Sequence, residues 1–135
     1  MSGRVLTSST IVDIATDRSV YGRAFLVAAV ELGMTFPTPS TALLQAWATV
    51  PVEARALLEL FLDAPAVVVE DLDASVAGRA GVRAHPTYQA GGFDIAAAHA
   101  VDVAIARGFP ILTAEPGPLR AIDPDVEIEE LPARR

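Results

Sequence analysis

The sequence predicts an α/β fold, a three-layer α/β/α sandwich around a short, mostly parallel central sheet. The first observation is that short strand-like runs alternate with helix-like stretches along the 135 residues, which favours a parallel sheet between helices. The second is the run AVVVE at 66–70, whose β-branched and nearly unbroken apolar character is typical of a buried parallel strand. The third is the stretch from Phe93 to Pro116, where a helix, a glycine stop and a short strand follow one another.

The first half of the chain predicts two strands and four helices. The strands are expected at 4–7 and at 34–36, and Pro37 and Pro39 are expected to stop the second one. The helices are expected at 11–15, from Asp17 or Ser19 to Leu32, from a Ser40 or Thr41 cap to Trp47, and from Pro51 onward. The hydroxyl run TSST at 7–10 either caps the helix after it or forms a polar cradle able to meet a phosphate.

The second half begins with the strand at 66–70 and a helix capped by Asp71 or Asp73. By composition, AHPTYQAGG at 84–92 is expected to be a loop. The elements expected after it are a helix at 95–105 that begins at Asp94, a strand at 110–113 followed by Glu115, a turn or short helix at 116–122, and a strand around Val126 and Ile128. We therefore expect one domain over 1–132 and a loose tail at 133–135.

Composition limits the possible functions. The hydrophobic content of 52% is more than so small a domain needs for its core, which favours a homodimer or a surface that binds another protein. The net charge of −7 disfavours non-specific binding to RNA or DNA. All ten basic residues are arginine, so a lysine-dependent phosphate loop is excluded, and no cysteine is present to form a disulfide. No apolar run reaches the roughly 18 residues of a membrane span, and we expect a cytoplasmic protein without membrane contact.

Four stretches in order resemble the PIN-domain family, which includes the VapC-type toxin ribonucleases. VLTSSTIVDIA is similar to the opening strand and turn of that family, PTPSTALLQAW to its second-motif helix, and FDIAAAHAVDVA to its third. GFPILTAEPGPLRAIDPDVEIEELP is similar to the closing strand, turn and final strand, so the resemblance covers almost the whole chain. It implies a site in which three or four acids hold Mg²⁺ or Mn²⁺ and activate water to cut RNA.

Two of the expected acids are replaced in this chain. The resemblance puts the first acid at Thr7 and the second at Gln45, both neutral, while the third is kept as Asp94 and the fourth is Glu115. Asp94 and Glu115 are thus the candidate catalytic and metal-binding residues, and a hydroxyl and an amide oxygen replace the missing carboxylates. The alternative interpretation is that Asp94 only caps its helix and Glu115 is only a surface acid.

Other residues could support this site. Ser9 and Asp13 are possible auxiliary residues near Thr7, although Asp13 is more typical of a cap or a solvated position. Asp102 shares a helix face with Asp94 but lies about 12 Å further along the axis, too far for one ion. His99 is expected to form a hydrogen bond within the helix packing.

Three functions remain open on sequence grounds. The favoured one is a PIN-like protein with weakened or lost nuclease activity, which acts by binding as a homodimer or with an antitoxin-like partner. The second is an active Mg²⁺- or Mn²⁺-dependent endoribonuclease, the toxin of a toxin–antitoxin pair, that uses Asp94 and Glu115. A receiver-type regulatory domain is the third, and it lacks the lysine that it would need near the last strand.

Overall fold

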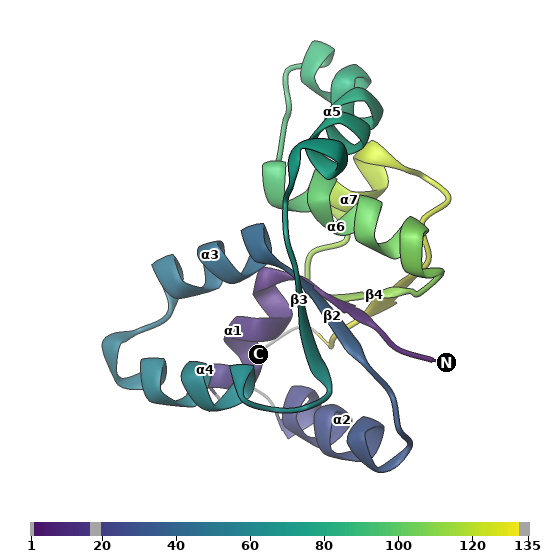
Figure 1. The fold of residues 1–135 in the computed structure, drawn as a ribbon. Helices are drawn as coiled ribbons and strands as arrows, with labels where there is room; N and C mark the ends of the chain where they lie inside the picture. Colours follow the sequence, from purple (N-terminus) through teal and green to yellow (C-terminus); the bar gives the residue numbers. More distant parts are fainter. Residues whose placement is uncertain (1, 17–19, 133–135) are drawn as a thin grey trace.

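A computed structural model describes residues 2–16 and 20–132 (Figure 1). Its strands are β1 (Val5–Leu6), β2 (Phe36–Pro39), β3 (Val67–Glu70), β4 (Ile111–Thr113) and β5 (Ile128–Glu130). Its helices are α1 (Ser8–Thr16), α2 (Val20–Glu31), α3 (Ser40–Thr49), the 3-10 helix η1 (Val52–Ala54), α4 (Arg55–Leu62), α5 (Ala74–Gln89), α6 (Ile95–Arg107) and α7 (Gly117–Ile122). The expected helix start at Asp17 or Ser19 and the expected tail at 133–135 lie outside the described residues.

The strands confirm the predicted parallel sheet. β1, β4 and β5 pair in parallel with β4 in the middle, and β2 pairs in parallel with β3. A single parallel bridge between Gly3 and Thr35 joins the two groups. The resulting order, β3-β2-β1-β4-β5, brings the carboxyl ends of β1 and β4 together near the middle of the sheet, where parallel folds commonly place their sites.

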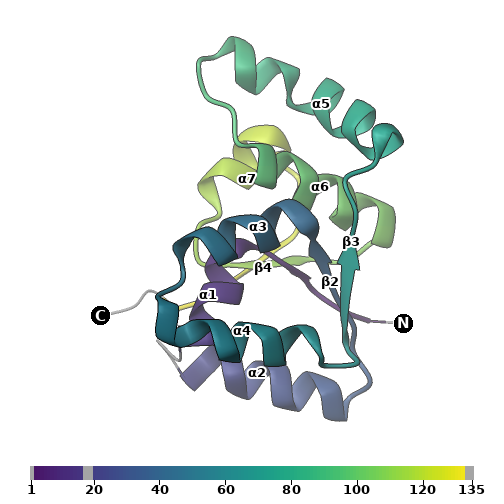
Figure 2. The same ribbon diagram turned by 60° about the vertical axis from the view of Figure 1, so that its left-hand side comes forward.

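Alternating side chains create the three layers. Leu6 pairs with Leu112, and both belong to an apolar cluster with α1, α2, α3 and α4. Their neighbours Val5 and Ile111 pair in the same way but belong to a second cluster with α6 and α7. Since successive strand residues point to opposite faces, the sheet lies between two sets of helices, as Figure 2 shows for α4 and α2 below it and α6 and α7 above it. The predicted α/β/α sandwich is therefore confirmed.

The expected stop at Pro37 is wrong, because β2 runs from Phe36 through Pro39. Thr35 exchanges backbone hydrogen bonds with the β1 side, donating to the Ser2 carbonyl and accepting from Arg4. Pro37 and Pro39 lie two and four residues after Thr35, so their backbone groups point to the same side of the strand, toward β1. The backbone groups of Phe36 and Thr38 point to the other side, toward β3. The two prolines therefore do not interrupt the pairing of β2 with β3. In the described part of the chain, the β1 and β2 segments are bridged between Gly3 and Thr35, just outside both strands.

The expectation that 66–70 forms a fully buried strand is also wrong. β3 pairs with β2 at the end of the strand order, and Val68 and Val69 are partly exposed. An apolar β-branched run indicates a strand, but it does not distinguish a central strand from an edge strand. One edge strand of the sheet, β3, is therefore uncharged at residues 67–69. The other edge strand, β5, carries Glu129 and Glu130.

Three helix boundaries differ from the expected ones. α5 continues through most of the expected loop at 84–92, with Pro86 inside it, and ends at Gln89. α1 already begins at Ser8, and α3 follows Pro39 without a side-chain cap from Ser40 or Thr41. Asp73 caps α5 by accepting a hydrogen bond from the Val76 N–H. Within the described ranges, no helix has both the length and the apolar content that crossing a membrane requires.

Candidate functional site

A small cleft of about 40 Å³ lies at the carboxyl ends of β1 and β4. Thr7 directly follows β1, Glu115 follows β4 by two residues, Asp94 precedes α6, and Gln45 lies in the middle of α3. All four line the cleft, together with Ser8, Ser9, Ala42, Ala96, Ala97, Thr113, Pro118 and Leu119. The structure brings together Thr7, Gln45, Asp94 and Glu115, the four positions that the family resemblance assigns to one site.

Hydroxyl groups form the floor of the cleft. The Thr7 hydroxyl donates to Thr113 Oγ1 at 2.9 Å and lies 3.0 Å from Ser9 Oγ. Ser9 Oγ accepts from the Ala114 N–H at 3.1 Å, and Thr113 Oγ1 accepts from the Glu115 N–H at 3.0 Å. The Ser9 and Thr113 hydroxyls thus satisfy backbone donors where β4 ends, and Thr7 supports this turn into Glu115 through its hydrogen bond to Thr113.

Asp94 and Gln45 are positioned by α1, α3 and α6. Asp94 caps α6, because its Oδ1 accepts a hydrogen bond from the Ala97 N–H at 3.0 Å. The Gln45 Oε1 accepts from the Ser8 hydroxyl at 3.2 Å, which links α3 to the first turn of α1. Capping and lining the cleft are therefore compatible for Asp94, since the cap engages only one carboxylate oxygen.

Asp13, the other auxiliary candidate, does not line this cleft. It lies further along α1 and lines a neighbouring groove of about 350 Å³ together with Gln45 and Glu115. In residues 2–16 and 20–132, no three side chains of the His, Cys, Asp and Glu types are placed to hold one metal ion. The donor set of the cleft is thus two carboxylates, one amide and several hydroxyls.

Asp102 has a structural role far from the cleft. It is almost completely buried on α6, where Arg79 of α5 donates to both of its oxygens and Arg83 to one of them. Burial alone raises the pKa of Asp102, but the hydrogen bonds and charges of Arg79 and Arg83 outweigh it and hold this pKa below its usual value. The carboxylate is therefore ionised at neutral pH and fastens α5 to α6.

His99 is completely buried between α6 and α3. Its Nδ1 lies 2.8 Å from the Thr41 hydroxyl, while its Nε2 has no hydrogen-bond partner among the described residues. Burial lowers the pKa of His99, and this outweighs the opposing effects of the nearby Asp71 carbonyl and the carboxylates of Asp102, Glu70 and Asp71. The ring is thus neutral in the folded protein, and its partner is on the neighbouring helix.

This burial predicts a loss of stability below about pH 6.5. The unfolded chain binds a proton on His99 near that pH, whereas the folded chain does so only at lower pH, so acid favours unfolding. Urea denaturation between pH 7.5 and 5 is expected to show this slope, and His99→Gln is expected to flatten it. The matched control is His85→Gln on the exposed side of α5, which should keep the slope. An unchanged slope in His99→Gln would contradict the prediction.

Sequence reasoning missed Thr113, whose hydroxyl lines the cleft. Thr113 ends the apolar strand just before Glu115, and it was not singled out. Its role depends on the parallel register of Leu6 with Leu112, which places the residues after β1 beside the end of β4. A hydroxyl at a strand's carboxyl end was the only signal available in the sequence.

Comparisons with known proteins show a shared fold. The chain matches no protein-family model and no curated protein. It is similar to a chain in the crystal structure of VapBC2 from Rickettsia felis bound to a promoter DNA fragment, with a TM-score of 0.74 and 15% identity over 96% of this chain and 99% of that one. It is also similar to a chain in DNA-bound VapBC from Salmonella typhimurium, with a TM-score of 0.74 and 18% identity over 96% and 98%. The chain thus has the mixed α/β fold found in these VapBC complexes.

Proposed function

We propose that the chain is a PIN-like protein of the toxin–antitoxin type that acts by binding, with its metal-dependent nuclease activity weakened or lost. The composition of the cleft is the observation that carries this proposal. Neutral groups, Thr7 and Gln45, stand where the family resemblance expects acids, and two carboxylates remain. The full-length structural similarity to chains of VapBC complexes supports the toxin–antitoxin relation.

The cleft fits a tightly held divalent cation poorly. Mg²⁺ requires near-octahedral oxygen ligands, and carboxylate charge supplies most of the attraction. Here one oxygen of Asp94 accepts from the Ala97 N–H, and the Thr7 hydroxyl is engaged with Thr113. The remaining oxygen donors are neutral except for Glu115 and the second Asp94 oxygen, so the cleft supplies little negative charge to hold the ion.

Calorimetric titration with Mn²⁺ tests this function. Wild-type protein is expected to give heats no larger than those of Asp94→Asn or Glu115→Gln, because two carboxylates alone bind the ion weakly. The same protein is expected to leave a panel of structured RNAs intact in the presence of Mn²⁺. Saturable binding that disappears in both variants would overturn the proposal.

A second candidate is an active metal-dependent endoribonuclease. The specific observation in its favour is that Asp94 and Glu115 line one cleft, with Gln45 and Thr7 available to orient water or phosphate. Substrate phosphates can complete the ligand shell of Mg²⁺ when protein carboxylates are few. This candidate predicts Mn²⁺-dependent RNA cleavage that is lost in Glu115→Gln, and growth arrest when the protein is expressed in cells.

Protein partners fit the binding function better than nucleic acid does. The net charge of −7 opposes contact with RNA phosphates, while the many exposed apolar side chains suit a second copy or an antitoxin-like protein. Co-expression with the product of the neighbouring gene tests the antitoxin-like partner. A stable complex is expected, and its absence on gel filtration would argue against this partner.

A further inference from the structure

The boundary between α3 and α6 shapes two hollows of the molecule. The two helices pack against each other, and both line the small cleft and a neighbouring apolar groove of about 550 Å³. Gln45 of α3, with Asp94 and Ala96 at the start of α6, lines both hollows. We call this boundary the α3–α6 seam and define it by these three residues together with Thr41 and His99. A change in the spacing of the two helices therefore alters the cleft and the groove together.

A hydrogen bond of a buried histidine crosses this seam. Thr41 is in the first turn of α3, and its hydroxyl lies 2.8 Å from Nδ1 of His99 on α6. His99 is completely buried, whereas Thr41 is only partly buried and also lines the apolar groove. The Thr41–His99 hydrogen bond thus ties the beginning of α3 to α6 at the side of the groove.

His99 needs a second hydrogen-bond acceptor before it can hold a second proton. A neutral imidazole carries one N–H group, whereas the protonated ring carries two and has no nitrogen left to accept a hydrogen bond. The Nε2 atom of His99 has no hydrogen-bond partner among the described residues. A buried N–H group without an acceptor is unfavourable, so uptake of a proton requires the groups around the ring to move.

The charged groups that act on His99 come from three elements. The carboxylates of Asp102 on α6, Glu70 on β3 and Asp71 after β3 favour the proton, and so does the Asp71 carbonyl. α3 contains no charged residue, so the helix on the far side of the seam neither attracts nor repels the proton. Burial opposes all of these groups and outweighs them, which lowers the pKa of His99.

Two of the three carboxylates already hold arginine side chains. Asp102 accepts hydrogen bonds from two arginines of α5 and Glu70 accepts them from one arginine of α6, namely Arg79, Arg83 and Arg107. Asp71 has no arginine partner among the described residues. The Asp71 carbonyl, in the connection between β3 and α5, is therefore the acceptor available to a protonated His99 ring.

We propose that the Thr41–His99 hydrogen bond is a pH-sensitive latch on the α3–α6 seam. In the neutral ring, Nδ1 accepts from the Thr41 hydroxyl and holds α3 against α6. In the protonated ring, Nδ1 no longer accepts, Nε2–H donates to the Asp71 carbonyl, and α3 is released. Release changes the cleft and the groove while the fold persists. The inference goes beyond the proposed function, because the latch acts on the seam whether or not the cleft binds a metal.

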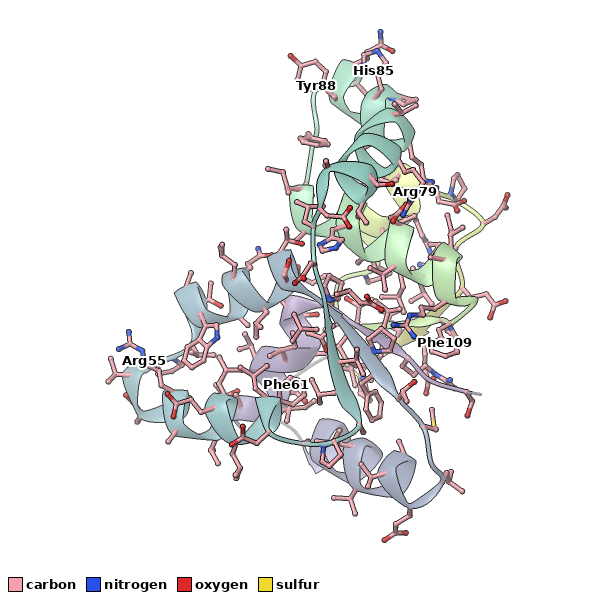
Figure 3. The ribbon with its side chains drawn as sticks, viewed as in Figure 1. Arg55, Phe61, Arg79, His85, Tyr88 and Phe109 are labelled. Carbon is pink, nitrogen blue, oxygen red and sulfur yellow. The ribbon has the colours of Figure 1, made fainter. Side chains whose placement is uncertain are left out.

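Trp47 makes the latch measurable, since it is the only tryptophan of the chain and belongs to α3. Its emission in the full chain is expected to shift below about pH 6.5, with the midpoint at which NMR shows the His99 ring titrating and with constant far-UV circular dichroism. His99→Gln should abolish the shift. The matched control is His85→Gln, at the outer end of α5 in Figure 3, which should keep it. An absent shift, a shift that persists in His99→Gln, or loss of the circular dichroism over the same range overturns the proposal.

Thr41→Val distinguishes a latch from a histidine that merely titrates. Valine keeps the shape of the threonine side chain and removes the hydroxyl, so the His99 ring should still titrate while the Trp47 emission no longer follows the pH. Thr41→Ser retains a hydroxyl and should retain the shift. A shift of wild-type size in Thr41→Val overturns the role of the hydrogen bond. The Mn²⁺ titration is a separate readout, so failure of the latch does not bear on whether the cleft binds metal.

Discussion

Replacing Thr7 by Asp and Gln45 by Glu together is expected to give the cleft an affinity for Mn²⁺ about 100-fold higher than that of the wild type. Both positions line the cleft beside Asp94 and Glu115, so the change raises the number of carboxylates from two to four. Two unit charges about 4 Å apart near a protein surface interact by about 4 kcal/mol before the cost of desolvation. A net gain of about 2.7 kcal/mol, which is 100-fold, is therefore a modest share of the added attraction.

The change should also be visible in stability. Without metal, four carboxylates in one cleft repel one another, and Thr7 no longer donates to Thr113, so the Tm of the double variant is expected to fall. Mn²⁺ should raise that Tm again, since the ion binds only the folded form. The control is Thr7→Asn, the neutral counterpart of Asp at the same site, which should leave Mn²⁺ affinity at the wild-type level. Equal affinity in the double variant and the wild type would contradict this account of the cleft.

Leu58→Ala is expected to lower the free energy of unfolding by about 2–5 kcal/mol. Leu58 is 0% exposed on α4 and belongs to the cluster that packs α1, α3 and α4 under the sheet, with Ile11, Phe36 and Leu112. Truncation removes apolar contacts and leaves a cavity that this dense cluster cannot fill completely. Because domains of this kind have about 5–15 kcal/mol of stability, the loss is a large fraction of the total.

The matched control for this prediction is on the same helix. Leu60→Ala makes the same chemical change two residues away, on a side chain that faces solvent, and should alter stability by no more than about 0.5 kcal/mol. Urea unfolding followed by circular dichroism, at a protein concentration fixed for all variants, measures both. Equal losses in the two variants would show that α4 does not pack as described.

The order of strands and helices was predictable because it depends on local signals. Gly108, with φ of 68°, ends α6 at the position predicted from the sequence, and Asp94 caps the start of the same helix. The longest error was the loop expected at 84–92, where Pro86 and two glycines resemble a break, yet α5 continues to Gln89. Composition cannot tell an exposed helix end from a loop, because the packing of Ala80 and Ala84 against Ala98 decides it.

The residues that meet in the cleft could be predicted better than the hydrogen bonds that they form there. The family resemblance assigned Thr7 and Glu115 to one site, and the fold brings them together because parallel strands have their carboxyl ends at one edge of the sheet. Whether the Thr7 hydroxyl faces a metal or another hydroxyl depends on the distance to Thr113, which only the register of β1 with β4 fixes.

In the described part of the chain, a parallel bridge between Gly3 and Thr35, just outside both strands, links the β1 side of the sheet to the β2 side. Pro37 and Pro39 have no N–H group to donate toward β1. Among the described residues, β2 and β3 therefore contact the remaining strands mainly through side-chain packing. Native-state amide exchange should therefore reveal two cooperative units, with faster exchange in β3 than in the central strand β4. The Ser8–Gln45 hydrogen bond joins α1, which follows β1, to α3, which follows β2, so the lining of the cleft itself fastens the two sides of the sheet to each other.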